Sequence, residues 1–264
     1  MHQLRLFFTA LQFFTRLPIP GWVGFDAAWL NQASRYFPLV GVVVALIGAG
    51  VYALAALLLP APVAAILSTA ATIYTTGAFH EDGFADMCDG FGGGMNRQRV
   101  LEIMKDSRIG AYGAIGIICM LGLKCTTLAM LNPAMAITAL LVAHPLSRLM
   151  ATSLIWRMSY AREEGKAKPL AQSMRSGEFA LASVTALLPA ILLGACGRLA
   201  WSALGYSILA AALVTLWLAR KIQHRLGGYT GDCLGAVQQV SEVAIYLALL
   251  AASAPVIVPT AWHS

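Results

Sequence analysis

The sequence predicts an all-α protein, a polytopic bundle of about seven transmembrane helices with a cytoplasmic N-terminus. Of the 264 residues, 59% are hydrophobic and only 11% are charged, whereas a soluble domain carries about 25% charged residues. Long uncharged segments also alternate with short basic ones, as in membrane proteins. This composition excludes a disordered chain, a coiled coil and a soluble nucleic-acid-binding protein, because each of these needs abundant polar residues.

The individual elements follow from the roughly 20 apolar residues that cross the hydrocarbon core. Residues 4–17 are rich in aromatic side chains and are predicted to form a helix in the headgroup region or a short re-entrant helix. The uncharged run from Tyr36 to Phe79 accommodates two spans with a turn at Pro60-Ala61-Pro62. The predicted spans are 36–59, 62–79, 109–130, 134–156, 179–197, 200–219 and 240–258.

Basic residues predict the orientation of these spans. With the N-terminus inside, the segments 1–35, 80–108, 157–178 and 220–239 lie in the cytoplasm, and they hold fifteen of the 18 Lys and Arg residues. The positive-inside rule therefore places the N-terminus inside and the C-terminus outside. The net charge of +6 reflects this topology, so the expected partner is a lipid bilayer and no nucleic acid. We expect a single integral membrane domain over residues 1–264.

Acidic residues are scarce in this chain, yet four of the twelve lie between positions 81 and 89. If this stretch is helical, Asp82, Asp86 and Asp89 stand at i, i+4 and i+7 and share one face. Three carboxylates on one face repel one another unless a cation lies among them. Oxygen ligands favour Mg²⁺ before Mn²⁺ or Ca²⁺. We therefore predict a magnesium site at these aspartates, with Glu81 as a further candidate ligand and a solvated acidic loop as the alternative.

The following segment offers groups that suit a phosphate. In residues 90–94, Gly92 and Gly93 are candidates for backbone N–H groups that converge on an anion, with a flexible loop as the alternative. No Walker-type lysine follows, which excludes a P-loop. Lys105 and Arg108 are predicted either to clamp phosphate oxygens or to anchor the next span. Asp106 is predicted to be a fourth acidic ligand or the partner of Arg108.

A glycine-rich segment near the C-terminus, residues 227–235, forms a third group of candidates. Within it, Gly228 and Asp232 are predicted to contact a phosphate or a metal at the mouth of the last span. Glu242 lies about 15 Å further along if the intervening residues are helical. An acid at that depth in a membrane is functional by default.

Three further ionisable residues, Lys124, His144 and Arg148, lie within predicted spans. Arg148 follows His144-Pro145 within a span and is a functional candidate for the same reason as Glu242. Lys124 is expected to extend its long stem to the membrane surface. For His144, a hydrogen-bonded buried histidine is favoured over a general base.

Taken together, these motifs resemble the cobalamin synthase family, the adenosylcobinamide-GDP ribazoletransferases. The resemblance covers most of the chain and is specific because the motifs occur in order. They lie at residues 14–20, 37–41, 80–90, 103–110, 147–148, 160–165 and 228–235.

The resemblance implies a phosphotransferase of the inner membrane of a prokaryote, with its active site facing the cytoplasm. The ribose 3′-hydroxyl of α-ribazole, or of its 5′-phosphate, attacks adenosylcobinamide-GDP, and GMP leaves. The three aspartates would hold one or two Mg²⁺ ions at the diphosphate. Asp89 or His80 would accept the hydroxyl proton. Arg108 and Lys105 would stabilise the leaving GMP, and Asp232 would hold a second metal or orient the ribose.

Several alternatives stay open at this stage. The segment from Arg162 to Glu164 would close over the corrin or form an ion-pair loop. The acidic motif partly resembles CDP-alcohol phosphotransferases, although Ala85-Asp86 stands where that family has Ala-Arg. An ion-coupled transporter is the second alternative, but its acids usually lie near the bilayer midplane in paired repeats. No repeat is visible here, and a homo-oligomer is left open.

Overall fold

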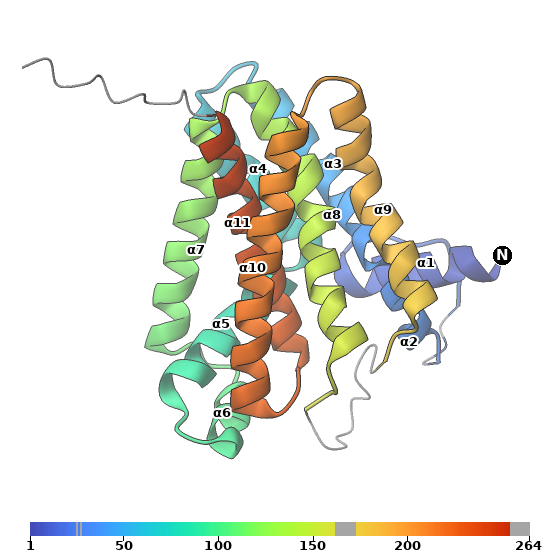
Figure 1. Cartoon of the computed structure of the whole chain (residues 1–264), viewed down its shortest axis with the longest axis vertical. Helices are drawn as coiled ribbons and strands as arrows, with labels where there is room; N and C mark the ends of the chain where they lie inside the picture. The colour runs from blue at the N-terminus through green and yellow to red at the C-terminus, as the bar shows by residue number, and fades with distance from the viewer. Residues whose placement is uncertain (25, 27, 162–172, 254–264) are drawn as a thin grey trace, which may run out of the picture.

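The computed structural model describes residues 1–24, 26, 28–161 and 173–253. In this part of the chain the backbone forms helices and one isolated bridge between Tyr160 and Tyr229, with no β-strand (Figure 1). The predicted all-α class is therefore confirmed.

The helices run in chain order through the bundle shown in Figure 1. They are α1 (His2–Phe14), α2 (Trp29–Ala33), the 3-10 turn η1 (Ser34–Tyr36), α3 (Phe37–Ala55), α4 (Ala61–Thr76), α5 (Phe79–Gly93), α6 (Arg97–Ile103), α7 (Ala111–Met130), α8 (Pro133–Arg157), α9 (Ser176–Ala195), α10 (Trp201–Leu226) and α11 (Gly231–Ser253). Among the described residues, six helical segments are long and apolar enough to cross a membrane. Counting α4 with α5 as one broken span gives seven.

The break between α4 and α5 turns the chain by 90°. Gly77 and Ala78 both adopt positive φ angles, +65° and +60°. Their N–H groups bond to the carbonyls of Tyr74 and Ile73, which ends α4 in the manner of a glycine C-cap. The helix α5 begins at once, so Glu81 and Asp82 fall in its first turn, where the helix dipole favours carboxylates. The stretch from 79 to 93 is thus helical, which is the condition for the aspartates to share a face.

The last span differs from its prediction. The segment 220–239 is predicted as a cytoplasmic polar stretch before a span at 240–258, but α10 continues to Leu226 and α11 already begins at Gly231. The difference arises because Gln238 and Gln239 are buried in α11 and hydrogen-bonded to other polar side chains. Polar residues in this helix therefore mark an interior cluster and not an exposed loop.

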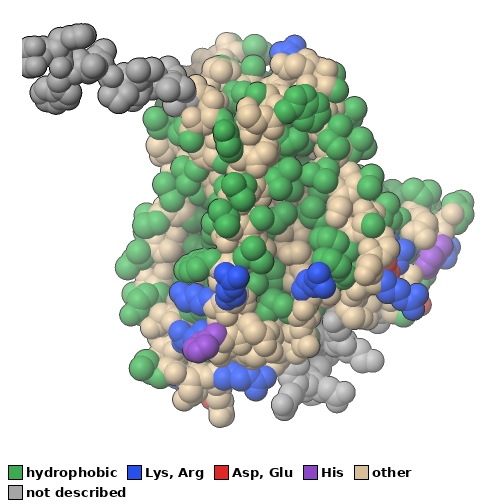
Figure 2. Space-filling view, viewed as in Figure 1, with side chains coloured by type: hydrophobic (Ala, Val, Ile, Leu, Met, Phe, Trp, Pro, Cys, Tyr) green, Lys and Arg blue, Asp and Glu red, His purple; other side chains and the backbone are tan. Residues whose placement is uncertain are grey.

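The polar segments meet at one end of the bundle. Arg97 donates hydrogen bonds to the carbonyls of Leu226 (2.9 Å) and Ala161 (2.6 Å). Arg225 donates to the carbonyl of Gly94 (2.5 Å). Figure 2 shows Lys and Arg side chains gathered in the lower half of the molecule, while hydrophobic side chains cover the upper part. Parts of three segments that are predicted to share one membrane face, at residues 94–97, 161 and 225–226, thus lie together. The N-in orientation stays a prediction.

Helices α3 and α8 approach each other closely at Gly41. A Cβ atom at this position would lie 2.7 Å from the carbonyl oxygen of His144 and 2.8 Å from the Cα atom of Pro145. Small residues allow such close approach between membrane helices. This contact fixes the position of α8 along α3, and therefore the depth in the bundle at which the buried polar residues of α8 lie.

We predict that Gly41→Ala lowers the thermal stability of the detergent-solubilised protein. The added methyl group meets backbone atoms that cannot move aside, and overpacking of this kind costs about 1–3 kcal/mol. The matched control is Gly50→Ala on the same helix, where a Cβ atom has nothing within 4 Å. Melting curves of both variants check this. Equal melting temperatures for the two variants would contradict the described packing.

Candidate active site

The acidic motif lies where α5 crosses the start of α11. A Cβ atom on Gly83 would lie 2.9 Å from the Cα atom of Asp232, and one on Gly235 would lie 3.0 Å from the carbonyl oxygen of His80. The two helices therefore touch through glycines. Because Asp82 directly precedes Gly83 on the helix, the crossing brings the third group of candidates next to the first.

The three aspartates of α5 share one side of the helix but differ in environment. Asp82 is exposed, Asp86 is half-buried and Asp89 is buried. The oxygens of Asp89 accept hydrogen bonds from the backbone N–H groups of Gly110 (2.7 Å) and Gly113 (2.8 Å). These N–H groups lie at the start of α7, where no preceding turn of the helix supplies carbonyl groups to accept their hydrogen bonds. Asp89 is therefore fixed against α7, whereas Asp82 faces solvent.

The predicted metal site is only partly assembled. In the described ranges, no three His, Cys, Asp or Glu side chains are gathered closely enough to hold a metal ion. The donor types nevertheless suit a hard cation, because Asp82 and Asp86 of α5 and Asp232 of α11 carry carboxylate oxygens, and the backbones of the two helices meet at Gly83 and Asp232. The magnesium site stays a prediction.

The glycine-rich stretch does not form the predicted anion-binding loop. Helix α5 continues through Gly93, and the N–H of Gly94 bonds to the carbonyl of Gly90 (2.9 Å). The N–H groups of this stretch thus lie within or at the end of a helix. A Cβ atom on Gly92 would lie 2.4 Å from the ring of Tyr112, so that glycine permits close packing. The predicted anion-binding loop at Gly92 and Gly93 is therefore wrong, because both residues are helical.

Gly228 likewise serves a close approach of two segments. A Cβ atom on it would lie 2.3 Å from the carbonyl oxygen of Ser159. The neighbouring Tyr229 forms the isolated bridge with Tyr160. The segment from Arg162 to Glu164, which is predicted to close over the corrin or to form an ion-pair loop, lies outside the described part of the chain.

A charged pocket of about 560 Å³ opens beside Asp89, between α5, α6 and the start of α7. Within it, Arg108 donates to both oxygens of Asp106, at 2.7 Å from Nη2 and 3.0 Å from Nε. These side-chain hydrogen bonds lower the pKa of Asp106 to about 2. Of its two predicted roles, Asp106 thus takes that of partner to Arg108. Lys105 is exposed on the same connection, and Arg99 adds a further guanidinium to the pocket wall.

A buried ionic cluster lies deeper in the bundle. Lys124 of α7 pairs with Glu242 of α11 at 2.9 Å and donates to the side-chain oxygen of Gln239 at 3.0 Å. Gln239 in turn donates to Glu81 (2.8 Å). Lys124 is only 2% exposed, so the expectation that it extends to the membrane surface is wrong. The sequence gives little sign of this, because a partner at position 242 is remote along the chain.

The cluster separates Glu81 from the aspartates of the same helix. The carboxylate of Glu81 is buried and bonds to Gln239 of α11, whereas Asp82 is exposed and Asp86 is half-buried. This bond argues against Glu81 as a metal ligand. Glu242 has further partners in Tyr246 (3.0 Å), Gln238 (2.6 Å) and His144 (3.4 Å). Glu242 is thus paired in the interior of the bundle, and its role in substrate binding stays a prediction.

Arg148 connects this cluster with a second pocket. It is 3% exposed, and its Nη1 donates to the carbonyl of His144 (3.0 Å). Its Nε is buried without a hydrogen-bond partner among the described residues. Together with His80 and Gln238, Arg148 lines both a cavity of about 10 Å³ beside the cluster and a larger pocket toward α1.

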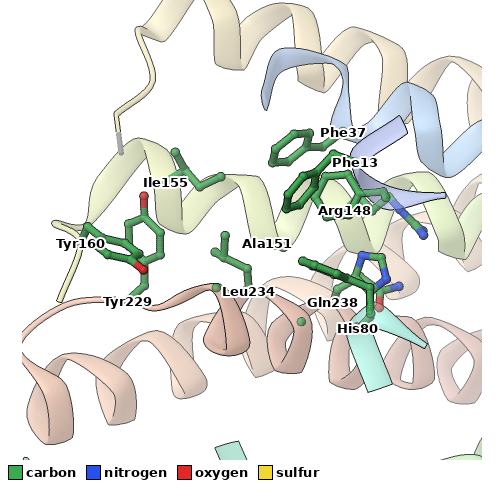
Figure 3. Close-up of a pocket in the computed structure, with 14 residues that line it drawn as sticks. Phe13, Phe37, His80, Arg148, Ala151, Ile155, Tyr160, Tyr229, Leu234 and Gln238 are labelled. Carbon is green, nitrogen blue, oxygen red and sulfur yellow. The ribbon is translucent and has the colours of Figure 1, made fainter. Parts of the chain in front are cut away.

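This larger aromatic pocket has a volume of about 140 Å³. Figure 3 shows Tyr160 and Tyr229 at one end of it and His80, Arg148 and Gln238 at the other. Phenylalanines from α1, α3 and α5 form much of its wall, and they are Phe13, Phe14, Phe37 and Phe79. Sequence reasoning missed this pocket, since its walls come from five distant segments and its aromatic residues look like ordinary membrane-helix residues.

Comparison with known proteins agrees with these motifs. The family model described as cobalamin-5-phosphate synthase matches residues 6–250. A Leptothrix cholodnii protein is 48% identical over 95% of this chain and 97% of its own length. Proteins from Shewanella frigidimarina (44%, 95% and 96%) and Ralstonia nicotianae (47%, 94% and 95%) are also similar. All three are named adenosylcobinamide-GDP ribazoletransferase. No solved structure matches.

We predict that Lys124→Met strongly destabilises the protein, because it leaves the buried carboxylate of Glu242 without its ammonium partner. Breaking a buried ion pair costs about 3–5 kcal/mol. Adding Glu242→Gln removes the orphaned charge, so the double variant is expected to recover part of the loss. Thermal unfolding in detergent measures both effects, with Lys221→Met at an exposed lysine as the control. Additive losses in the double variant would argue against the pair.

Proposed function

We infer that this chain, which belongs to the cobalamin-5-phosphate synthase family, is a ribazoletransferase that completes cobalamin synthesis. It joins adenosylcobinamide-GDP to α-ribazole or α-ribazole 5′-phosphate and releases GMP. The observation that carries this inference is identity of 48% over nearly the full length of a named ribazoletransferase. The match also disfavours a CDP-alcohol phosphotransferase or a transporter.

The reaction is a displacement at phosphorus. The ribose 3′-oxygen forms a bond to the phosphorus next to the cobinamide, the bond from that phosphorus to the GMP oxygen breaks, and a base takes the hydroxyl proton. Such reactions depend on positioning and on neutralising charge at the diphosphate. The chain has to supply carboxylates for a cation, a base and cationic groups for the leaving nucleotide.

Residues at the α5–α11 crossing suit the first of these tasks. Asp82, Asp86 and Asp232 would hold Mg²⁺. Asp89 of α5, which is fixed by hydrogen bonds from the start of α7, would support them. When bound, the ion would act as a Lewis acid and template for the diphosphate. The carboxylates would bind the cation directly. Because Asp82 is exposed, the cation could reach the site from solvent.

The structure favours His80 over Asp89 as the base. Each oxygen of Asp89 already accepts a backbone N–H, whereas His80 lines the aromatic pocket beside the crossing. A neutral imidazole nitrogen can accept the proton of a hydroxyl group. Arg108 and Lys105 would bind the phosphate of the departing GMP beside the charged pocket, with Asp106 orienting Arg108.

We further propose that the protein lies in the inner membrane with this end of the bundle in the cytoplasm. The support is the gathering of basic side chains around the lower ends of α5, α6 and α10 (Figure 2).

Asp82→Asn is expected to reduce GMP release by a factor of 100 or more (order of magnitude ~10²–10³ for loss of one electrostatic contact). Since the side chain is exposed, the melting temperature should stay near that of the wild-type protein. The control is Asp26→Asn, which changes an exposed acid near α2. Normal turnover by Asp82→Asn would remove that residue from the site.

Removal of divalent cations is expected to stop the reaction. Excess chelator should abolish GMP release by the purified enzyme, and Mg²⁺ should restore it, with Mn²⁺ restoring part of it because both ions accept carboxylate oxygens. Full activity in chelator would refute the assignment of the aspartates as metal ligands.

A further inference from the structure

We propose that the aromatic pocket binds the base of the acceptor nucleoside, and that Arg148 donates a hydrogen bond to the imine nitrogen of that base. The base of α-ribazole is a dimethylated benzimidazole, which is planar, uncharged and largely apolar. The proposal rests on the ribazoletransferase function inferred above and assigns a place to one of its substrates.

The shape and chemistry of the walls suit a flat aromatic ring. Phe14 packs edge-on against Phe37 (ring centroids 4.6 Å apart) and lies nearly parallel to His80 (5.5 Å, 15°). At the other end, Tyr160 and Tyr229 form a T-shaped pair. Aromatic groups favour such stacked and edge-on contacts with further rings. The pocket volume of about 140 Å³ is close to that of an apolar cavity of about 150 Å³ that binds benzene, and the pocket is partly open.

The polar end of the pocket supplies what the base needs. Benzimidazole glycosylated at one nitrogen keeps a single hydrogen-bond acceptor, its other ring nitrogen. Arg148 lines the pocket, and its buried Nε has no partner in the described chain. A buried donor left without a partner costs about 1–3 kcal/mol. A ligand that offers one acceptor at this end would satisfy it.

Other occupants fit these walls less well. Guanine carries donors and acceptors on several edges, and burying them against phenylalanine rings would leave them unsatisfied. The corrin ring is far larger than the pocket. A lipid acyl chain would suit the walls but would leave the Nε of Arg148 without an acceptor. The charged pocket beside Asp89, with Arg99 and Arg108, is better matched to the guanine nucleotide.

The position of the pocket agrees with the chemistry. His80, Gly231 and Gly235 line it, and they belong to the same α5–α11 crossing that brings Asp232 next to α5. A base held among the phenylalanines would therefore leave its ribose near the carboxylates. The reacting hydroxyl and the proposed metal ligands would lie on adjoining sides of one helix crossing.

A pair of nucleosides tests the hydrogen bond without altering the protein. The riboside of dimethylindole has a C–H group where the benzimidazole riboside has its imine nitrogen, and the shape is otherwise the same. The wild-type enzyme is expected to show a KM at least about fivefold higher for the indole riboside. In an Arg148→Met variant that retains the fold, this difference should disappear. Equal KM values with wild-type enzyme would overturn the role of Arg148.

Two pocket variants test the location. Ala151→Phe fills the pocket and is expected to raise the KM for α-ribazole about tenfold or more, with the KM for adenosylcobinamide-GDP unchanged. Ile155→Ala enlarges it and should allow turnover of a riboside whose base has a third fused ring. This second variant keeps the test valid if Ala151→Phe fails to fold. The matched control is Ala180→Phe at an exposed position of α9.

The outcomes separate this inference from the function on which it rests. If wild-type protein releases no GMP from the natural substrates, the ribazoletransferase function is wrong. If it does, but Ala151→Phe folds with an unchanged KM for α-ribazole, or Ile155→Ala does not accept the larger base, the pocket does not hold the base. In that case a lipid chain is the remaining occupant.

Discussion

The contact between α5 and α11 is the constraint on which the rest of the site depends. Gly83 and Gly235 let the two backbones approach until a Cβ atom would lie about 3 Å from the facing chain. Any larger residue would separate the helices and move Asp232 away from Asp82 and Asp86. The same approach places His80 at the wall of the aromatic pocket. Two glycines thus set the distance between α5, which carries His80 and the three aspartates, and α11, which carries Asp232.

The buried ionic cluster holds these helices in register from the inside. It joins α5, α7, α8 and α11 through Glu81, Lys124, His144 and Glu242, which are all nine-tenths or more buried. Buried charges are costly unless they are paired, so the cluster strongly favours the one arrangement that pairs them. Arg148 lies between this cluster and the pocket and belongs to both.

Much of this architecture can be predicted from the sequence. Hydropathy gives α3, α7, α8 and α9 closely, because membrane helices need long apolar runs. It does not show that α4 forms a span only together with α5, or that α10 continues to Leu226. The spacing of Asp82, Asp86 and Asp89 gives a shared face, and the structure makes that stretch helical. The resemblance to a known family then leads to the function without any coordinates.

Other features depend on contacts that a single sequence does not display. The start of α11 is misplaced because Gln238 and Gln239 look like loop residues until their partners are known. Lys124 looks like an interfacial lysine because Glu242 is far away along the chain. The glycines at 92 and 93 suggest an anion loop, whereas Gly92 accommodates Tyr112. In each case the partner comes from another helix.

The most direct test of this account is a titration with Mn²⁺ monitored by electron paramagnetic resonance. The purified protein should show a saturable site that is lost both in Asp82→Asn on α5 and in Asp232→Asn on α11. The Asp106→Asn variant, whose carboxylate is already held by Arg108, should retain it. If Asp232→Asn binds Mn²⁺ as tightly as the wild-type protein, the two helices do not share a metal site, and the account is wrong.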